Sequence, residues 1–149
     1  MARIRRTEPA NEPVTAFVGS RLRALRHDRQ LSAQAVADEL AVAVPRVYEW
    51  ETGTVSPSPH NLAQLAAVFD VDPVELLDVD PDALTLVELR VVAGFTRRAV
   101  AARLGVGYNS LYAYETGLRR LGDDRAKTLA RLYRVPVEVV HAAVARLDR

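Results

Sequence analysis

The amino-acid sequence contains one pattern twice, displaced by 64 residues. Residues 32–53 read SAQAVADELAVAVPRVYEWETG, and residues 96–117 read TRRAVAARLGVGYNSLYAYETG. Their apolar positions coincide, both segments end in Glu-Thr-Gly, and the correspondence continues on either side without a gap. Self-similarity at a fixed period indicates a repeated structural unit. Two domains are therefore expected, although a chain of 149 residues would otherwise suggest one.

Within each copy, the pattern predicts two short helices joined by a tight turn. In the second copy, Thr96 can cap the first helix with its hydroxyl, and Gly105 suits the left-handed position that follows a helix. The next helix is predicted from about Tyr108 to Thr116, and it ends at Gly117. Two helices connected in this way form a helix-turn-helix.

Three regions follow from the duplication and from the proline-containing breaks in the sequence. Residues 1–13 are predicted to form a flexible basic arm, whose arginines either touch DNA or are simply solvated. The first domain is predicted over residues 14–79 and the second over residues 80–149. Each domain is expected to contain five short helices and no strand, so the predicted fold class is all-α.

Individual helix ends are predicted from capping residues and prolines. The first helix is expected over residues 14–29, and a short fifth helix is expected to open at Pro73. In the second domain, Thr85 and Glu88 match a capping box, and Asp123 is placed to cap the fourth helix.

The composition excludes several classes of function. The chain has no cysteine and its three histidines are far apart, so we expect no disulfide, no catalytic thiol and no metal site. It shows no nucleophile–base arrangement or glycine-rich phosphate loop, and we expect no enzyme, catalytic residue or cofactor. Neither a bilayer-spanning apolar run nor a secretory signal is found. A cytoplasmic bacterial or phage protein is expected, without membrane or small-molecule partners.

The net charge of +1 conceals an asymmetry between the two halves. Residues 14–79 carry five arginines against nine acidic residues, whereas residues 80–149 carry twelve arginines and lysines against eight acidic residues. A local excess of positive charge favours binding to a polyanion. The second half is therefore predicted to bind nucleic acid more strongly than the first.

The duplicated pattern resembles the XRE-type helix-turn-helix family, which includes the lambda and 434 repressors and Cro. The resemblance covers about 130 of the 149 residues. It rests on LRALR (22–26), LSAQAVADEL (31–40), RVYEWETG (46–53), FTRRAVAARLGV (95–106) and SLYAYETG (110–117). It implies two tandem five-helix, lambda-repressor-like DNA-binding domains. In such domains the second helix of the motif lies in the major groove of double-stranded DNA.

For the second domain, the resemblance implies that Tyr108, Asn109 and Ala113 face the base edges. Asparagine can bond adenine through two groups, and alanine can meet a thymine methyl group. Phosphate contacts are implied for the start of the preceding helix, for the recognition helix and for the loop that follows it. These residues are Arg97, Arg98, Ser110, Tyr112, Arg119 and Arg120. A solvated surface is the alternative explanation for the arginines.

The first domain departs from this pattern. Its base-facing positions are Val44, Pro45 and Glu49, of which the first two cannot donate to a base and the third repels phosphates unless it accepts from cytosine. Gln34 and Arg46 remain as its implied phosphate contacts. The first domain is expected to read thymine methyl groups, to bind weakly or to serve mainly in dimerisation.

Members of the family also pair an arginine of the first helix with the glutamate that closes the recognition helix. The corresponding pairs are Arg26 with Glu51 and Arg90 with Glu115. We expect both pairs to clamp a domain internally rather than to contact DNA, because a bidentate arginine–carboxylate bond fixes two helices geometrically.

Two classes of function remain. The first is a sequence-specific DNA-binding transcriptional regulator of the bacterial nucleoid, expected to be a repressor. Either both domains share one asymmetric site, or a homodimer forms through the first domain and reads DNA with the second. The second class is an antitoxin-like or other protein-binding module, in which the first domain docks a partner or dimerises.

Overall fold

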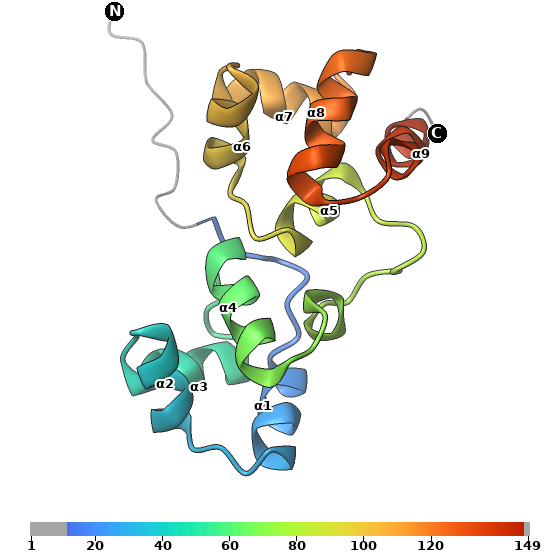
Figure 1. Ribbon diagram of the computed structural model, residues 1–149. Coiled ribbons are helices and arrows are strands. Elements are labelled where there is room, and N and C mark those ends of the chain that lie inside the picture. Colours follow the sequence, from blue (N-terminus) through green and yellow to red (C-terminus); the bar gives the residue numbers. More distant parts are fainter. Residues whose placement is uncertain (1–11, 148–149) are drawn as a thin grey trace, which may run out of the picture.

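The computed structural model describes residues 12–147 (Figure 1). Apart from an isolated bridge between Phe17 and Leu77, the regular structure of these residues is helical, which confirms the all-α prediction. The elements are α1 (Gly19–Asp28), α2 (Ala33–Leu40), α3 (Val44–Thr52), α4 (Pro59–Phe69), the 3-10 helix η1 (Pro73–Leu76), α5 (Leu86–Val92), α6 (Arg97–Leu104), α7 (Tyr108–Thr116), α8 (Asp123–Tyr133) and α9 (Val137–Leu147). Of the predicted arm, only Glu12 and Pro13 are among the described residues.

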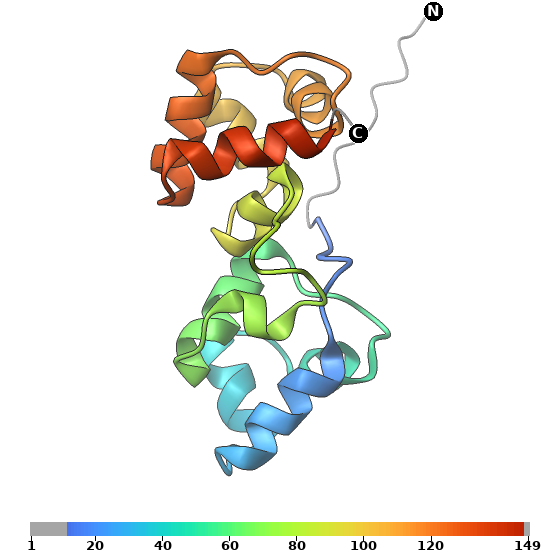
Figure 2. The same cartoon turned by 90° about the vertical axis from the view of Figure 1, so that its right-hand side faces the viewer.

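The helices form two bundles, with α5 between them (Figures 1 and 2). The first domain comprises α1 to α4 and η1, around a core that includes Leu22, Trp50 and Phe69. The second domain comprises α5 to α9, around a core that includes Leu111 and Leu129. Within residues 12–147, every helix is too short or too polar to traverse a lipid bilayer.

Helix α5 contributes to both cores. Leu86 and Leu89 belong to the core of the second domain, whereas Val91 is buried in the core of the first. Just after α5, Gly94 adopts a left-handed φ of 85°, and a Cβ atom there would lie only 3.0 Å from the Cβ of Ala63 on α4. The two bundles are thus packed directly against one another through α4 and α5.

Side-chain caps define the start of the corresponding helices α2 and α6. The Ser32 hydroxyl accepts a hydrogen bond from the Ala35 amide at 3.0 Å, and the Thr96 hydroxyl accepts one from the Ala99 amide at 3.1 Å. Helix α6 ends on Gly105 at a left-handed φ of 69°, as predicted. These caps satisfy amides that have no partner inside the helix.

The start of α1 differs from the prediction, because the helix begins at Gly19 rather than at residue 14. The preceding residues are not helical: Thr15 and Ala16 form a turn, the Val14 amide donates to the Pro57 carbonyl at 2.9 Å, and the Val18 amide donates to the Leu76 carbonyl at 2.9 Å. Tertiary hydrogen bonds therefore replace the helical ones that the apolar spacing suggested. The residues before α1 form a strap along the first domain.

Two further helix starts differ from the prediction in their caps. Thr85 caps α5, but only half of the expected capping box is formed, since Oε2 of Glu88 is buried without a hydrogen-bond partner. Gly122, not Asp123, is the N-cap of α8, and Asp123 occupies the first turn, where its charge favours the helix dipole. The fifth element of the first domain opens at Pro73 as predicted, as a 3-10 helix whose start carries a complete capping box between Asp72 and Glu75.

Candidate nucleic-acid interface

Helix α7 presents the predicted base-facing residues of the second domain at its surface. Asn109 is exposed and Tyr108 and Ala113 are half-buried, while Leu111 and Tyr114 turn to the core. Tyr112 is 43% exposed. A helix that buries one face and leaves an asparagine and a tyrosine on the other can offer both to a ligand that lies along it.

The side chain of Arg97 lies against α7 instead of extending into solvent. Its Nε donates to Oε1 of Glu115 at 2.7 Å, and its Nη1 donates to the Tyr108 hydroxyl at 3.0 Å. The guanidinium carbon lies 5.3 Å from the ring centroid of Tyr108 and 5.2 Å from that of Tyr112. Burial alone would lower the pKa of Arg97, but the hydrogen bond and charge of Glu115 outweigh it and raise the pKa. This arginine therefore orients the recognition helix.

The guanidinium of Arg90 lies fully buried beneath the start of α6. Its Nε donates to Oε2 of Glu115 at 2.7 Å, and its Nη1 donates to the Phe95 carbonyl at 3.0 Å. Burial opposes the charged form, but Glu115 and Glu12 together raise the pKa of Arg90, so it stays charged. A buried charge of this kind is stable only when it is paired and hydrogen-bonded.

Glu12 completes this cluster, although no feature of the sequence pointed to it. Its two carboxylate oxygens accept hydrogen bonds from Nη1 and Nη2 of Arg90 at 2.9 and 2.8 Å. The same carboxylate accepts the backbone amide of Arg97, the first residue of α6, at 2.9 Å. Helical periodicity and capping rules say nothing about a single acid ahead of the first helix, so only the tertiary structure shows this contact.

The corresponding cluster of the first domain is simpler. Nε of Arg26 donates to Oε2 of Glu51 at 2.7 Å, and its Nη2 donates to Oε1 at 2.9 Å. Its remaining Nη1 donates to the Leu31 carbonyl at 3.2 Å, as Arg90 does to Phe95. Ala33 occupies the position of Arg97, so the first domain has one arginine where the second has two.

Three further arginines are exposed on the segments that precede and follow α7. Arg98 is exposed on the first turn of α6, and Arg119 and Arg120 are exposed in the loop between α7 and α8. Nη1 of Arg119 donates to the Ser110 hydroxyl at 3.2 Å, which links this loop to the recognition helix. Of the expected phosphate-facing residues of the second domain, Arg97 and Ser110 are half-buried and the others are exposed.

The matching residues of the first domain are held by acidic neighbours. Nε2 of Gln34 donates to Asp38 at 2.7 Å, and Nη1 of Arg46 lies 3.3 Å from Oε2 of Glu49. Val44 is half-buried and Pro45 is exposed at the start of α3. Each candidate donor of this domain is thus paired with a carboxylate, which weakens its attraction for a phosphate.

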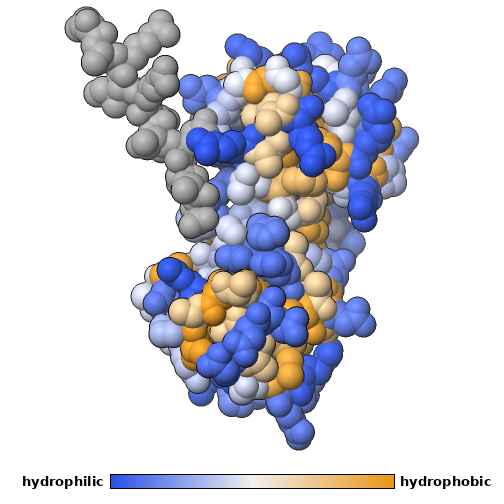
Figure 3. All heavy atoms as spheres, turned by 60° about the vertical axis from the view of Figure 1, so that its left-hand side comes forward, coloured by the Kyte–Doolittle hydropathy of each residue, from blue (hydrophilic) through white to orange (hydrophobic). Residues whose placement is uncertain are grey.

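Figure 3 brings forward the side of the molecule that carries α2 and α6. Hydrophilic side chains surround apolar areas in both halves, and no single broad apolar face dominates this view. Such a mixed, largely polar surface is typical of a face that meets water or a charged ligand.

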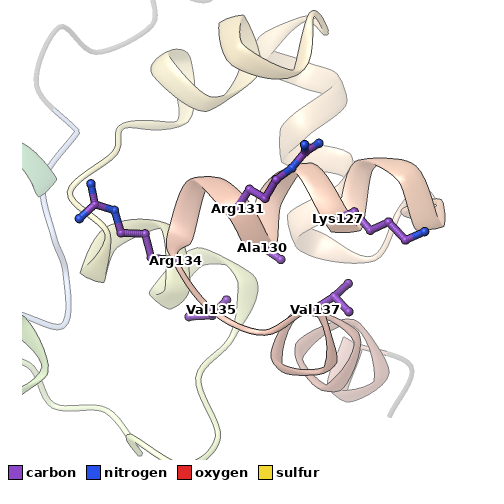
Figure 4. A pocket seen from close by; sticks show the side chains of 6 residues that line it. All are labelled: Lys127, Ala130, Arg131, Arg134, Val135 and Val137. Atoms are coloured by element: carbon purple, nitrogen blue, oxygen red, sulfur yellow. The ribbon is translucent and has the colours of Figure 1, made fainter.

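A separate hollow of about 580 Å³ lies where α8 turns into α9. Figure 4 shows its lining, in which three apolar side chains lie close together and three basic side chains extend away from one another. The lining residues are Lys127, Ala130, Arg131, Arg134, Val135 and Val137. None belongs to α6, α7 or the loop after α7, so the hollow is distinct from the candidate interface. Among the described residues, no group of three or more metal-ligating side chains is present.

Comparison with protein families agrees with the duplicated architecture. A model described as a helix-turn-helix domain matches residues 18–79, and a model described as helix-turn-helix matches residues 86–140. Together the two matches cover most of the chain and coincide with the two bundles. No curated protein and no solved structure matched the chain in the same comparisons.

Proposed function

We propose that this chain, which belongs in both halves to the helix-turn-helix family of XRE type, is a sequence-specific transcriptional regulator whose second domain is the stronger reader of DNA. The observation that carries this proposal is the contrast between α7 and α3. Helix α7 exposes Asn109, and arginines are exposed on α6 and in the loop after α7, whereas α3 carries Glu49 in an ion pair with Arg46. Phosphate contacts supply most of the affinity of such proteins, and base contacts supply the specificity.

In this proposal, α7 lies in the major groove and Asn109 bonds an adenine through two groups. Arg98, Arg119 and Arg120 contact phosphates on either side, while Arg97 fixes the orientation of α7 through Glu115 and Tyr108. The protein acts as a binder and not as an enzyme, within the bacterial nucleoid. Occupation of a promoter by such a protein represses transcription by excluding polymerase.

Selection of bound sequences from a random pool of duplex DNA tests the proposal, followed by affinity measurements on the selected site over a range of salt. The double variant Arg119→Ala with Arg120→Ala should weaken binding and reduce the slope of log affinity against log salt by about 1.8, since each lost phosphate contact accounts for about 0.9.

The matched control is Arg131→Ala with Arg134→Ala, which removes the same charge from the hollow beside α9 and should leave the slope nearly unchanged. A protein that selects no sequence and shows no shift of DNA at low salt would contradict the proposed function.

A second candidate function is supported by the first domain. Tyr48 of α3 is 51% exposed next to the internally paired Arg46 and Glu49, a surface that suits a protein partner better than a phosphate backbone. In this case the first domain docks a second copy or an unlike protein. A footprint distinguishes the arrangements, because one asymmetric site per chain requires both domains on DNA, whereas a palindrome requires a homodimer.

A further inference from the structure

The ion cluster at the start of α6 contains one more arginine than the corresponding cluster of the first domain. Arg26 and Glu51 balance each other, whereas Arg90 and Arg97 share the single carboxylate of Glu115. Without another anion, the second cluster would have a net charge of +1 at a helix N-terminus, where the helix dipole adds further positive potential. The cluster is therefore an anion site that the first domain lacks.

Glu12 occupies this anion site in the structure. Its carboxylate takes two parallel hydrogen bonds from the guanidinium of Arg90, at 2.8 and 2.9 Å, and a third from the amide of Arg97, at 2.9 Å. A forked guanidinium and a free amide in the first helical turn are the donors that bind phosphate oxygens in proteins. The carboxylate thus uses the same donors that a phosphate would use.

The accessibility of the two arginines supports this description. The side chain of Arg90 is 0% exposed beneath Glu12, whereas that of Arg26, for which no second carboxylate partner is found within residues 12–147, is 11% exposed. Removal of the Glu12 carboxylate would therefore open Arg90 to solvent at the N-terminus of α6. The same helix carries Arg98 on its exposed side, close to the proposed DNA surface.

The position of Glu12 is maintained by the first domain. Val14 is buried in the first core, and its amide donates to the Pro57 carbonyl at 2.9 Å. Because Glu12 is only two residues from this anchor, its Cα atom is held within about 7 Å of a fixed point. A tethered group of this kind competes with a free ligand at a high effective concentration.

We propose that Glu12 is an autoinhibitory latch, whose carboxylate fills the anion site at the start of α6 and must leave before a DNA phosphate can bind there. The inference rests on the proposed DNA-binding function of the second domain. The segment before α1 is held in place by the first domain, and through Glu12 it lowers the DNA affinity of the second domain.

The test compares the wild-type protein with Glu12→Gln and Glu12→Ala, and uses Glu138→Gln on the exposed side of α9 as the control for loss of one negative charge. Affinity for the selected DNA site should rise about tenfold in both Glu12 variants, and the salt slope should steepen by about 0.9, because one more phosphate contact becomes available. The control should show neither change.

A second measurement does not depend on DNA. Titration with inorganic phosphate, followed by the backbone amide resonance of Arg97, should shift this resonance in the Glu12 variants at concentrations that leave the wild-type resonance in place. In the wild-type protein, saturation with DNA should move the side-chain carbonyl resonance of Glu12 to the value of a solvated carboxylate. Because this measurement uses the wild-type protein, it does not depend on whether a variant folds.

The outcomes separate the two proposals. Equal DNA affinity and salt slope in wild type and Glu12 variants, with a Glu12 resonance that DNA does not move, would overturn the latch while leaving DNA binding intact. Phosphate binding that appears only in the Glu12 variants, without DNA binding by any of the proteins, would support the latch and contradict the proposed function.

Discussion

Arg97 and Glu115 form an ion pair of 2.7 Å that joins the start of α6 to the end of α7. The first domain cannot form this pair, because Ala33 occupies the equivalent position. In both domains the closing glutamate is clamped to α1 or α5, but only in the second does it also hold the helix that precedes the recognition helix. The second helix-turn-helix is therefore the more rigidly fixed of the two.

Arg97→Ala should lower the free energy of unfolding by about 1.5–3 kcal/mol, since a hydrogen bond to a charged partner is lost and Glu115 keeps only Arg90. It should also loosen Tyr108, which accepts from Arg97. Urea denaturation provides the measurement. Lys127→Ala, which removes an exposed charge from α8, should change the value by less than about 0.5 kcal/mol. An Arg97 variant as stable as wild type would mean that the pair contributes nothing.

Gly19→Ala should be far more damaging than the same substitution at Gly107. A Cβ at residue 19 would lie 2.1 Å from the Trp50 carbonyl oxygen and 2.6 Å from that of Glu51, and neither backbone atom can move aside without displacing the end of α3. We expect a loss of more than about 3 kcal/mol, measured by thermal denaturation. Gly107→Ala, where a Cβ meets nothing within 4 Å, should change stability by less than about 1 kcal/mol.

Tyr133→Phe should reduce the loss of stability at alkaline pH. Burial of the phenol is the main cause that raises the pKa of Tyr133 above its usual value, and the charge of Glu115 adds to it. Because the folded state holds the proton more tightly than the unfolded state, this contribution is complete below about pH 10 and falls as the pH rises above it. Between pH 9 and pH 11, the wild-type protein should lose about 1.4 kcal/mol more than the variant in urea denaturation. Parallel pH profiles would show that Tyr133 makes no such contribution.

Val91→Ala should weaken the first domain, although Val91 belongs to the first helix of the second. The substitution removes two methyl groups from the core that contains Trp50, at an expected cost of about 1.5–2.5 kcal/mol. Trp50 is the only tryptophan, so its fluorescence reports the unfolding of the first domain. The midpoint of that transition should fall for Val91→Ala and stay in place for Val139→Ala, an exposed position of α9. If the midpoint of the Trp50 transition were the same in Val91→Ala as in the wild type, Val91 would not stabilise the first domain, and the two domains would unfold independently.

Local signals in the sequence were sufficient to predict the helix-turn-helix units. Thr96, Gly105 and Gly117 mark helix ends through hydrogen bonds and backbone angles that depend on neighbours a few residues away. The sequence period of 64 residues then extended each prediction from one half to the other. The all-α class and the tandem arrangement followed from these signals alone.

Contacts between distant segments were not predictable in this way. The apolar spacing of residues 14–29 fits a helix, but the hydrogen bonds of Val14 and Val18 to Pro57 and Leu76 hold its first part in a non-helical conformation. The side chain of Arg97 likewise lies against α7 because it donates hydrogen bonds to Tyr108 and Glu115, which are distant from it in the sequence. The role of Glu12 depends on a cluster 78 residues further along the chain.

The contact between Gly94 and Ala63 also bears on how separate chains can stack on one another. The residue of the second domain that corresponds to Ala63 is Lys127, and Arg131 follows it one turn later, in place of the small Ala67. A third bundle stacked in the same manner would have to press its backbone onto these charged side chains. Separate chains meet the same obstacle, so these charged side chains oppose head-to-tail association of chains through this contact.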